Sequence, residues 1–170
     1  PPAVGWTKEV RVIHHGIARL AARGIGVIAA LAFLAAPVSA RTLGLVADDT
    51  TNSATVFDAD TNTVLGSVPI QNGSAIGDVL VTPDQRLGFV TNFNYQVFVV
   101  DLTTPPPSLA TGTNPIAIAN HGEDLALSPD GRFLLVSNGS LPEPIAVIDI
   151  ASRTQIETFA TGSATNALDV

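Results

Sequence analysis

The sequence predicts an all-β domain built from repeated four-stranded antiparallel units, and three observations support this fold class. Charged residues make up only 14% of the 170-residue chain, which has 14 glycines and 12 prolines. That composition suits short strands joined by tight turns. Apolar runs rich in valine alternate with those turns. One turn-and-strand pattern also recurs at a spacing of about 40 to 50 residues, which is typical of repeat architectures.

The repeat is seen most clearly in two segments of eleven residues. Residues 82–92 read TPDQRLGFVTN, and residues 128–138 read SPDGRFLLVSN. Matching apolar segments flank both copies. They are GDVLV and EDLAL upstream at 77–81 and 123–127, and QVFVVDL and EPIAVIDI downstream at 96–102 and 143–150, with a third downstream copy, ATVFDAD, at 54–60. Four strands in each repeat at this spacing predict the blades of a β-propeller.

The turn residues give each copy a physical basis. The prolines Pro83 and Pro129 preset the second position of a type I turn, which Gly131 closes in one copy and Gln85 in the other. The aspartate that ends each VFD, VVD or VID strand is expected to cap the following turn through its own backbone. The runs FVTN and LLVSN are largely apolar, so we expect them to be buried between neighbouring blades.

These patterns divide the chain into a leader, residues 1–40, and a blade region, residues 41–170. The blades are expected at about 43–70, 76–110 and 122–160, with the start of a further blade at 164–170. The outer strand of the second blade is expected to be weak because three consecutive prolines, 105–107, cannot donate to a strand ladder. A connection is expected at 111–120. The predicted fold is thus a partial β-propeller of about three four-stranded blades.

The repeat resembles the YVTN-type (YncE-like) repeat proteins, which are seven-bladed propellers. FVTN at 89–92 and LVSN at 135–138 are similar to the motif that names this family, and VVD and VID are similar to its third strand. The resemblance covers nearly all of residues 43–170. A ring of seven such blades would need roughly 300 residues. The resemblance therefore implies that this sequence is the N-terminal fragment of a longer propeller.

The leader has the pattern of a helical signal peptide. Basic residues at 8–23 precede an apolar run of 13 residues at 24–36, and the small residues Val38 and Ala40 follow. Cleavage is expected after Ala40, which predicts a periplasmic or extracellular bacterial protein without a stable membrane span. The run is shorter than the roughly 20 apolar residues that span a bilayer. An uncleaved N-terminal anchor is the alternative.

Charge limits the class of partner. From Arg41 onward the sequence has four basic residues and fourteen acidic ones, a net charge of −10. Such a surface repels phosphate backbones, so nucleic acid is not expected as a partner. The chain has no cysteine. The sequence shows no phosphate-binding loop, zinc signature or serine–histidine–aspartate order, and we expect no cofactor, no metal and no catalytic residues.

Four residues are candidates for ligand binding. His121 is the one histidine after the leader and is followed closely by Glu123, in a loop that enters an inner strand. Asn92 and Asn138 end the two copies of the repeated strand. In propellers such loops line one mouth of the central channel, where ligands usually bind. Solvated loop residues and ordinary turn chemistry would explain the same pattern.

The sequence leaves three functions open. The first is an exported module that binds a protein, a polymer or a small ligand, or acts as a scaffold for it. The second is an enzyme or enzyme subunit, because propellers related to the resemblance include lactonases and periplasmic quinone- or haem-dependent dehydrogenases. The third is a structural protein of the cell surface. Propellers host many unrelated activities, so the fold alone does not decide among them.

Overall fold

The computed structural model describes residues 41–71, 75–139 and 144–162. The predicted signal peptide at 1–40 and the predicted strand at 164–170 lie outside the described residues. Within the described residues the regular structure consists entirely of β-strands, as the sequence predicts. None of these residues forms a helix long and apolar enough to cross a membrane.

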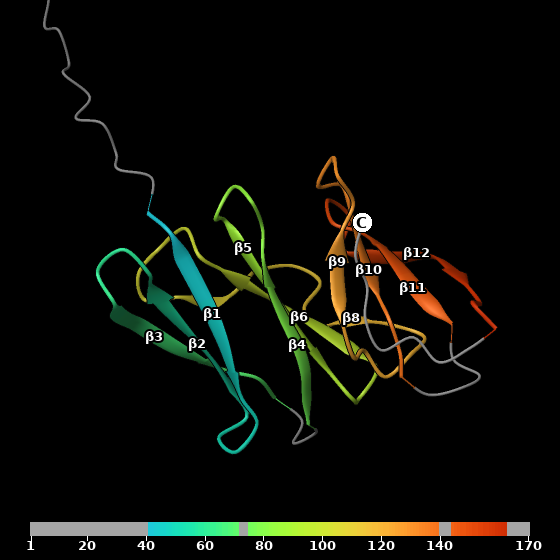
Figure 1. Ribbon diagram of the computed structural model, residues 1–170, viewed down its shortest axis with the longest axis horizontal. Coiled ribbons are helices and arrows are strands. Elements are labelled where there is room, and N and C mark those ends of the chain that lie inside the picture. Colours follow the sequence, from blue (N-terminus) through green and yellow to red (C-terminus); the bar gives the residue numbers. More distant parts are fainter. Residues whose placement is uncertain (1–40, 72–74, 140–143, 163–170) are drawn as a thin grey trace, which may run out of the picture. The chain divides into compact units, whose positions relative to one another are not determined.

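The strands form three antiparallel sheets that follow one another along the chain (Figure 1). Sheet 1 contains β1 (Leu43–Asp48), β2 (Ser53–Asp58) and β3 (Thr63–Pro69). Sheet 2 contains β4 (Ile76–Val81), β5 (Leu87–Asn92), β6 (Gln96–Asp101), β7 (Ser108–Leu109) and β8 (Ile116–Ala117). Sheet 3 contains β9 (Leu125–Leu127), β10 (Phe133–Val136), β11 (Ile145–Asp149) and β12 (Thr154–Phe159).

Sheet 2 is buried on both faces, because successive side chains of a strand point to opposite sides. On β5, Phe89 packs into one apolar core and its neighbour Val90 into another. On β6, Val97 and Val99 join the first core, whereas Phe98 joins the second. The first core includes strands of sheet 3, and the second includes strands of sheet 1. The predicted burial of the FVTN strand on both faces is therefore confirmed.

The turns that the repeat predicts are present with matching hydrogen bonds. In the turn before β5, the Thr82 hydroxyl donates to Asp84 Oδ1 at 2.6 Å, and in the turn before β10 the Ser128 hydroxyl donates to Asp130 Oδ1 at 2.6 Å. Gly131 has φ of 68°, and Gln85 adopts φ of 60° at the equivalent position. The Gln85 side chain also accepts a hydrogen bond from the backbone N–H at the start of β1 at 2.6 Å, which links sheet 2 to sheet 1.

The aspartates that end the third strands cap the turns that follow, as expected. Asp58 Oδ1 accepts the backbone N–H groups two and three residues later at 2.9 and 3.0 Å. Asp149 Oδ1 accepts the N–H and the hydroxyl of Ser152 at 2.8 and 3.0 Å. The second carboxylate oxygen of Asp58 accepts from Arg41 at 2.7 Å. Asp58 and Asp60 therefore belong to a hairpin turn.

The outer edge of sheet 2 differs from a simple weak strand followed by a connection. β7 pairs with one end of β6, and β8 pairs with the other end. Between them the side chain of Asn114 substitutes for a strand, because it accepts from Val99 N at 3.0 Å and donates to Val99 O at 2.7 Å. The prolines before β7 shorten the first piece. Residues 111–120, which the sequence predicts to be a connection, thus contribute β8 and the side chain of Asn114 to sheet 2.

Candidate functional site

The candidate site lies where β5 meets β6, at the segment 118–124 that leads into β9, and where β10 ends. The side chain of Asn120, which is fully buried, holds this segment in place through hydrogen bonds. Its Nδ2 donates to the carbonyl oxygens of Val136 at 2.7 Å and Pro144 at 2.9 Å. Its Oδ1 accepts from Gly122 N at 3.2 Å. This amide fastens the His121 loop to sheet 3.

Glu123 extends the pairing of β9 with β10. Its backbone N–H donates to Ser137 O at 2.9 Å, and Ser137 N donates to Asp124 O at 3.0 Å. The Glu123 side chain lies against Gly139, where an added Cβ would overlap the carboxylate. Among the described residues, that carboxylate has neither a hydrogen bond nor an ion pair. Glu123 thus brings a carboxylate to the lining of the cavity.

The β5–β6 turn brings two aromatic rings to the same place. Asn92 is only 1% exposed, and its Oδ1 accepts from Asn94 N at 3.1 Å, which closes the turn. Phe93 and Tyr95 are left 39% and 42% exposed. Tyr95 has φ of 62°, in the left-handed region that residues with a side chain rarely adopt. Its carbonyl oxygen accepts from Ile118 N at 2.9 Å, which ties the turn to the His121 segment.

The imidazole of His121 contacts both rings. The centroids of His121 and Tyr95 are 4.5 Å apart with an interplanar angle of 47°. Those of His121 and Phe93 are 6.5 Å apart at 67°, an edge-to-face arrangement. Such geometries are favourable for aromatic pairs. The three side chains therefore form one aromatic wall drawn from two separate loops.

A cavity of about 360 Å³ opens beside this wall, and its lining residues are Phe93, His121, Glu123, Asn138 and Gly139. Three of the four residues that the sequence singles out thus line one cavity. Asn92, the fourth, is not among the lining residues and shapes the adjacent turn. Sequence reasoning missed Phe93 and Gly139. Their signal is their position one residue after the asparagines that end the repeated strands.

One half-buried carboxyl group on β4, that of Asp78, connects sheets 2 and 3 near the site. Asp78 Oδ2 accepts from Leu125 N at 3.0 Å, across the boundary between sheets 2 and 3. Burial raises the pKa of Asp78 above 3.8, and a hydrogen bond with the Asp124 carboxyl adds to the increase. Asp78 thus helps to join the two sheets, and it holds its proton more tightly than an exposed aspartate.

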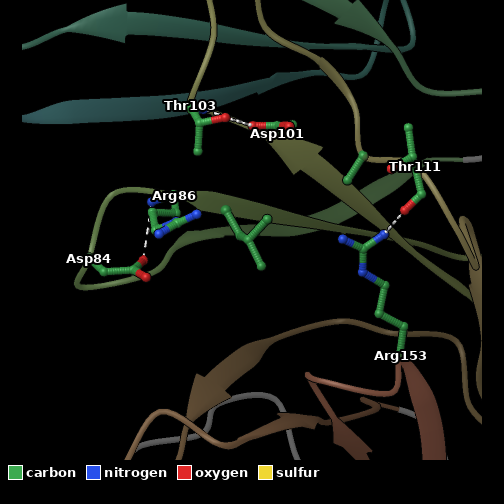
Figure 2. A pocket seen from close by; sticks show the side chains of 8 residues that line it. Asp84, Arg86, Asp101, Thr103, Thr111 and Arg153 are labelled. Carbon is green, nitrogen blue, oxygen red and sulfur yellow. Dashed lines mark hydrogen bonds between the residues drawn. The ribbon is translucent and has the colours of Figure 1, made fainter.

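A second cavity, of about 290 Å³, lies at the opposite ends of the strands (Figure 2). Figure 2 shows Arg153 reaching the carbonyl oxygen of Thr111, and Arg86 near the turn of Asp84. Hydrogen bonds from Thr103 and then the positive charges of Arg153 and Arg86 hold the pKa of Asp101 below its usual value. Both signs of charge line this cavity, so it offers no single charge to a ligand.

Metal-binding potential is limited in the part of the chain that the structure describes. No group of three or more histidine, cysteine, aspartate or glutamate side chains lies close enough there to hold a metal ion. The carboxylates at the ends of the strands are instead engaged in the turns.

Comparison with known proteins bears on the fold. No protein-family model matches the chain, and no curated protein sequence matches it. Among solved structures, hydrazine synthase from Kuenenia stuttgartiensis is 24% identical with a TM-score of 0.63, over 72% of this chain and 34% of that one.

Two further solved structures show similar likeness. A functionally unknown protein from Desulfotomaculum acetoxidans DSM 771 is 21% identical with a TM-score of 0.56, over 70% of this chain and 37% of that one. Dihydro-heme d1 dehydrogenase NirN in complex with DHE is 22% identical with a TM-score of 0.52, over 69% of this chain and 24% of that one. The chain thus spans little more than a third of these proteins at most. The likenesses support a β-propeller-like fold for the chain.

Proposed function

We propose that this chain is part of an exported β-propeller of the YVTN type, and that it binds an organic ligand in the cavity beside His121. The observation that carries the proposal is the convergence of three separate loops on one opening. Each loop contributes a chemically different group, namely an aromatic ring, an imidazole with a carboxylate, and an amide. Concave sites with a few convergent polar groups are the usual form of small-molecule sites.

The way these groups are held supports binding. The β5–β6 turn and the His121 segment are linked by a backbone hydrogen bond, and the buried amide of Asn120 fixes that segment to sheet 3. Sheet 2 is packed on both faces, so the loops project from a rigid framework. A preorganised site loses little conformational entropy when a ligand binds.

Export is tested by producing the whole 170-residue chain in a bacterial host and sequencing the N-terminus of the protein released from the periplasm. Export with cleavage gives a protein that begins at Arg41. The Ala40→Arg variant, in which a large charged residue replaces the small one before the cut, should retain the leader. A wild-type chain that stays in the cytoplasm, or keeps residues 1–40, contradicts this part of the proposal.

Binding is tested on the recovered protein by NMR with four probes of different chemistry, namely choline, glucose, citrate and gluconolactone. We expect at least one probe to shift the backbone signals of residues 118–124 and 93–95 together. The Phe93→Ala variant should weaken that shift, and the Phe159→Ala variant, at an exposed ring on β12, should not. If no probe shifts these signals, the cavity is not a small-ligand site.

The same panel separates binding from catalysis. A module that only binds leaves gluconolactone unchanged beyond its spontaneous hydrolysis. An enzyme of the lactonase kind would consume it faster, with His121 or Glu123 acting on the water or on the leaving oxygen. The hydrolysis rate with and without protein decides between the two functions.

A further inference from the structure

The cavity beside His121 combines features that, taken together, favour one class of ligand. The chain has only one tyrosine and seven phenylalanines. Of these, Tyr95 and Phe93 are among the few large side chains that the described residues leave exposed, and both contact the same histidine. The faces of aromatic rings carry partial negative charge and attract cations.

The backbone of Tyr95 indicates that the position of this ring is maintained at a cost. A residue with a side chain in the left-handed region is less stable than glycine there. The Asn92 side chain and the backbone provide hydrogen bonds to this turn. A tyrosine in this conformation places an aromatic ring against His121, which lines the cavity. Residues held in such conformations cluster at ligand-binding sites.

The charge around the cavity also favours a cationic ligand. The Glu123 carboxylate has no cationic partner among the described residues, and the absence of a side chain at Gly139 leaves room for it. The region from Arg41 onward has a net charge of −10, which attracts cations and repels anions. A positive ligand would therefore meet both a local carboxylate and a favourable field.

We infer that the cavity binds an organic cation, an ammonium or methylated ammonium group, between the Glu123 carboxylate and the Phe93 ring, beside the His121 ring on which Tyr95 packs. The inference rests on the proposed function of this cavity. Asn138 lines the same cavity. Rings and a carboxylate around an ammonium group are a recurrent solution in cation recognition.

The test compares choline with its neutral isostere, 3,3-dimethylbutan-1-ol, which has the same shape and no charge. Both are titrated into the whole exported protein while the NMR signals of residues 93–95 and 118–124 are followed. Choline should bind at least about fivefold more tightly than the isostere, since a cation–π contact at an exposed site contributes about a two- to fivefold gain and the carboxylate adds to it. Choline binding should also weaken as salt is raised.

Two variants test the residues with matched controls. Glu123→Gln should weaken choline binding about three- to tenfold, as expected for the loss of a charge-assisted contact that is partly screened. Glu157→Gln, on an exposed strand, should leave it unchanged. Tyr95→Gly should weaken binding about two- to fivefold while the denaturation midpoint stays near that of the wild type, because glycine relieves the backbone strain. That combination distinguishes a binding role from a structural one.

The source of the cation is resolved by a parallel titration with Nα-acetyl-lysine amide. Tighter binding of this compound than of choline assigns the site to lysine side chains of a protein, and the reverse assigns it to a small free ammonium compound. Equal binding of choline and its isostere, unaffected by Glu123→Gln, overturns the cation inference and leaves the proposed binding function standing. If none of choline, glucose, citrate and gluconolactone shifts these signals, the proposed function fails as well.

Discussion

The side chain of Asn120 should contribute a large part of the stability of the candidate site, and Asn120→Ala measures it. The substitution leaves the buried carbonyl oxygen of Val136, the part-buried carbonyl oxygen of Pro144 and the buried N–H of Gly122 without this partner. Each unmet buried group costs about 1–3 kcal/mol, and water that enters the vacated space recovers part of this. We expect a loss of about 2–4 kcal/mol, which is large against a typical total of about 5–15 kcal/mol.

The assay is urea denaturation of the whole chain, followed by far-ultraviolet circular dichroism, with hydrogen exchange of the Gly122 amide as a local readout. Asn120→Asp keeps the volume and the acceptor for Gly122 but places carboxylate oxygens against two carbonyl oxygens, so its loss at neutral pH should equal or exceed that of alanine. Thr113→Ala, at an exposed position before β8, serves as the control and should change the free energy of unfolding by less than about 0.5 kcal/mol.

The reasoning is refuted if Asn120→Ala unfolds within about 0.5 kcal/mol of the wild type. In that case the buried amide is not needed to hold the segment. If global stability falls but exchange of the Gly122 amide is unchanged, the loss occurs elsewhere, and the link between Asn120 and the His121 loop is wrong.

Three further predictions concern other contacts. The pKa of Asp78 is raised in the folded protein, so its contribution to stability is present below pH 3.8 and is lost as the pH rises through the raised pKa. The unfolding free energy of Asp78→Asn relative to the wild type should therefore increase above pH 3.8. A difference that does not change with pH contradicts this prediction. Gly77→Ala should lower the free energy of unfolding by at least about 1–3 kcal/mol in urea denaturation, because a Cβ there meets the backbone of Gly122. Gly88→Ala should lower it less, because the Cβ there meets the end of a leucine side chain. Equal losses would show that the backbone of Gly122 can shift. Gln85→Gly relieves the strain of a left-handed backbone but removes a hydrogen bond to β1. The two effects are each about 1 kcal/mol, so the denaturation midpoint should change little. A gain in unfolding free energy of more than about 1 kcal/mol would show that the hydrogen bond to β1 contributes little.

Much of the fold could be predicted because the repeat encodes local structure twice. The serine or threonine, the aspartate and the glycine-like residue of each turn make the hydrogen bonds that their chemistry requires, and they make them at equivalent positions in both copies. The burial of β5 and β6 on both faces follows from unbroken apolar runs. When the two copies agree, each supports the structure predicted for the other.

The outer edge of sheet 2 could not be predicted in this way. Its strand is replaced by two short pieces and the side chain of Asn114, and a lone asparagine gives no periodic signal in a sequence. Its role appears only when the fold brings it beside Val99, fifteen residues away. Long-range side-chain to backbone hydrogen bonds are not encoded in local pattern.

The candidate site was predictable in part for the same reason. His121 and Glu123 could be identified because they stand in a loop that precedes an inner strand, and Asn138 because it ends a repeated strand. Asn92 and Asn138 are equivalent in the repeat and both are buried, yet only Asn138 lines the cavity, and Phe93 lines it in place of Asn92. Which neighbour faces the opening depends on how each turn is closed, and the two β-turn sequences differ.

The divided outer edge of sheet 2 also bears on association between molecules. A continuous exposed edge strand offers a row of free N–H and C=O groups to any passing β-strand, and such edges promote aggregation. On β6 the positions opposite Val99 are occupied by an amide side chain, and β7 and β8 are two residues each. An added strand therefore finds no ladder of useful length at this outer edge, whereas β3 and β12, with seven and six residues, are longer edge strands on sheets 1 and 3. Intermolecular strand addition should accordingly avoid the β7 and β8 edge of sheet 2.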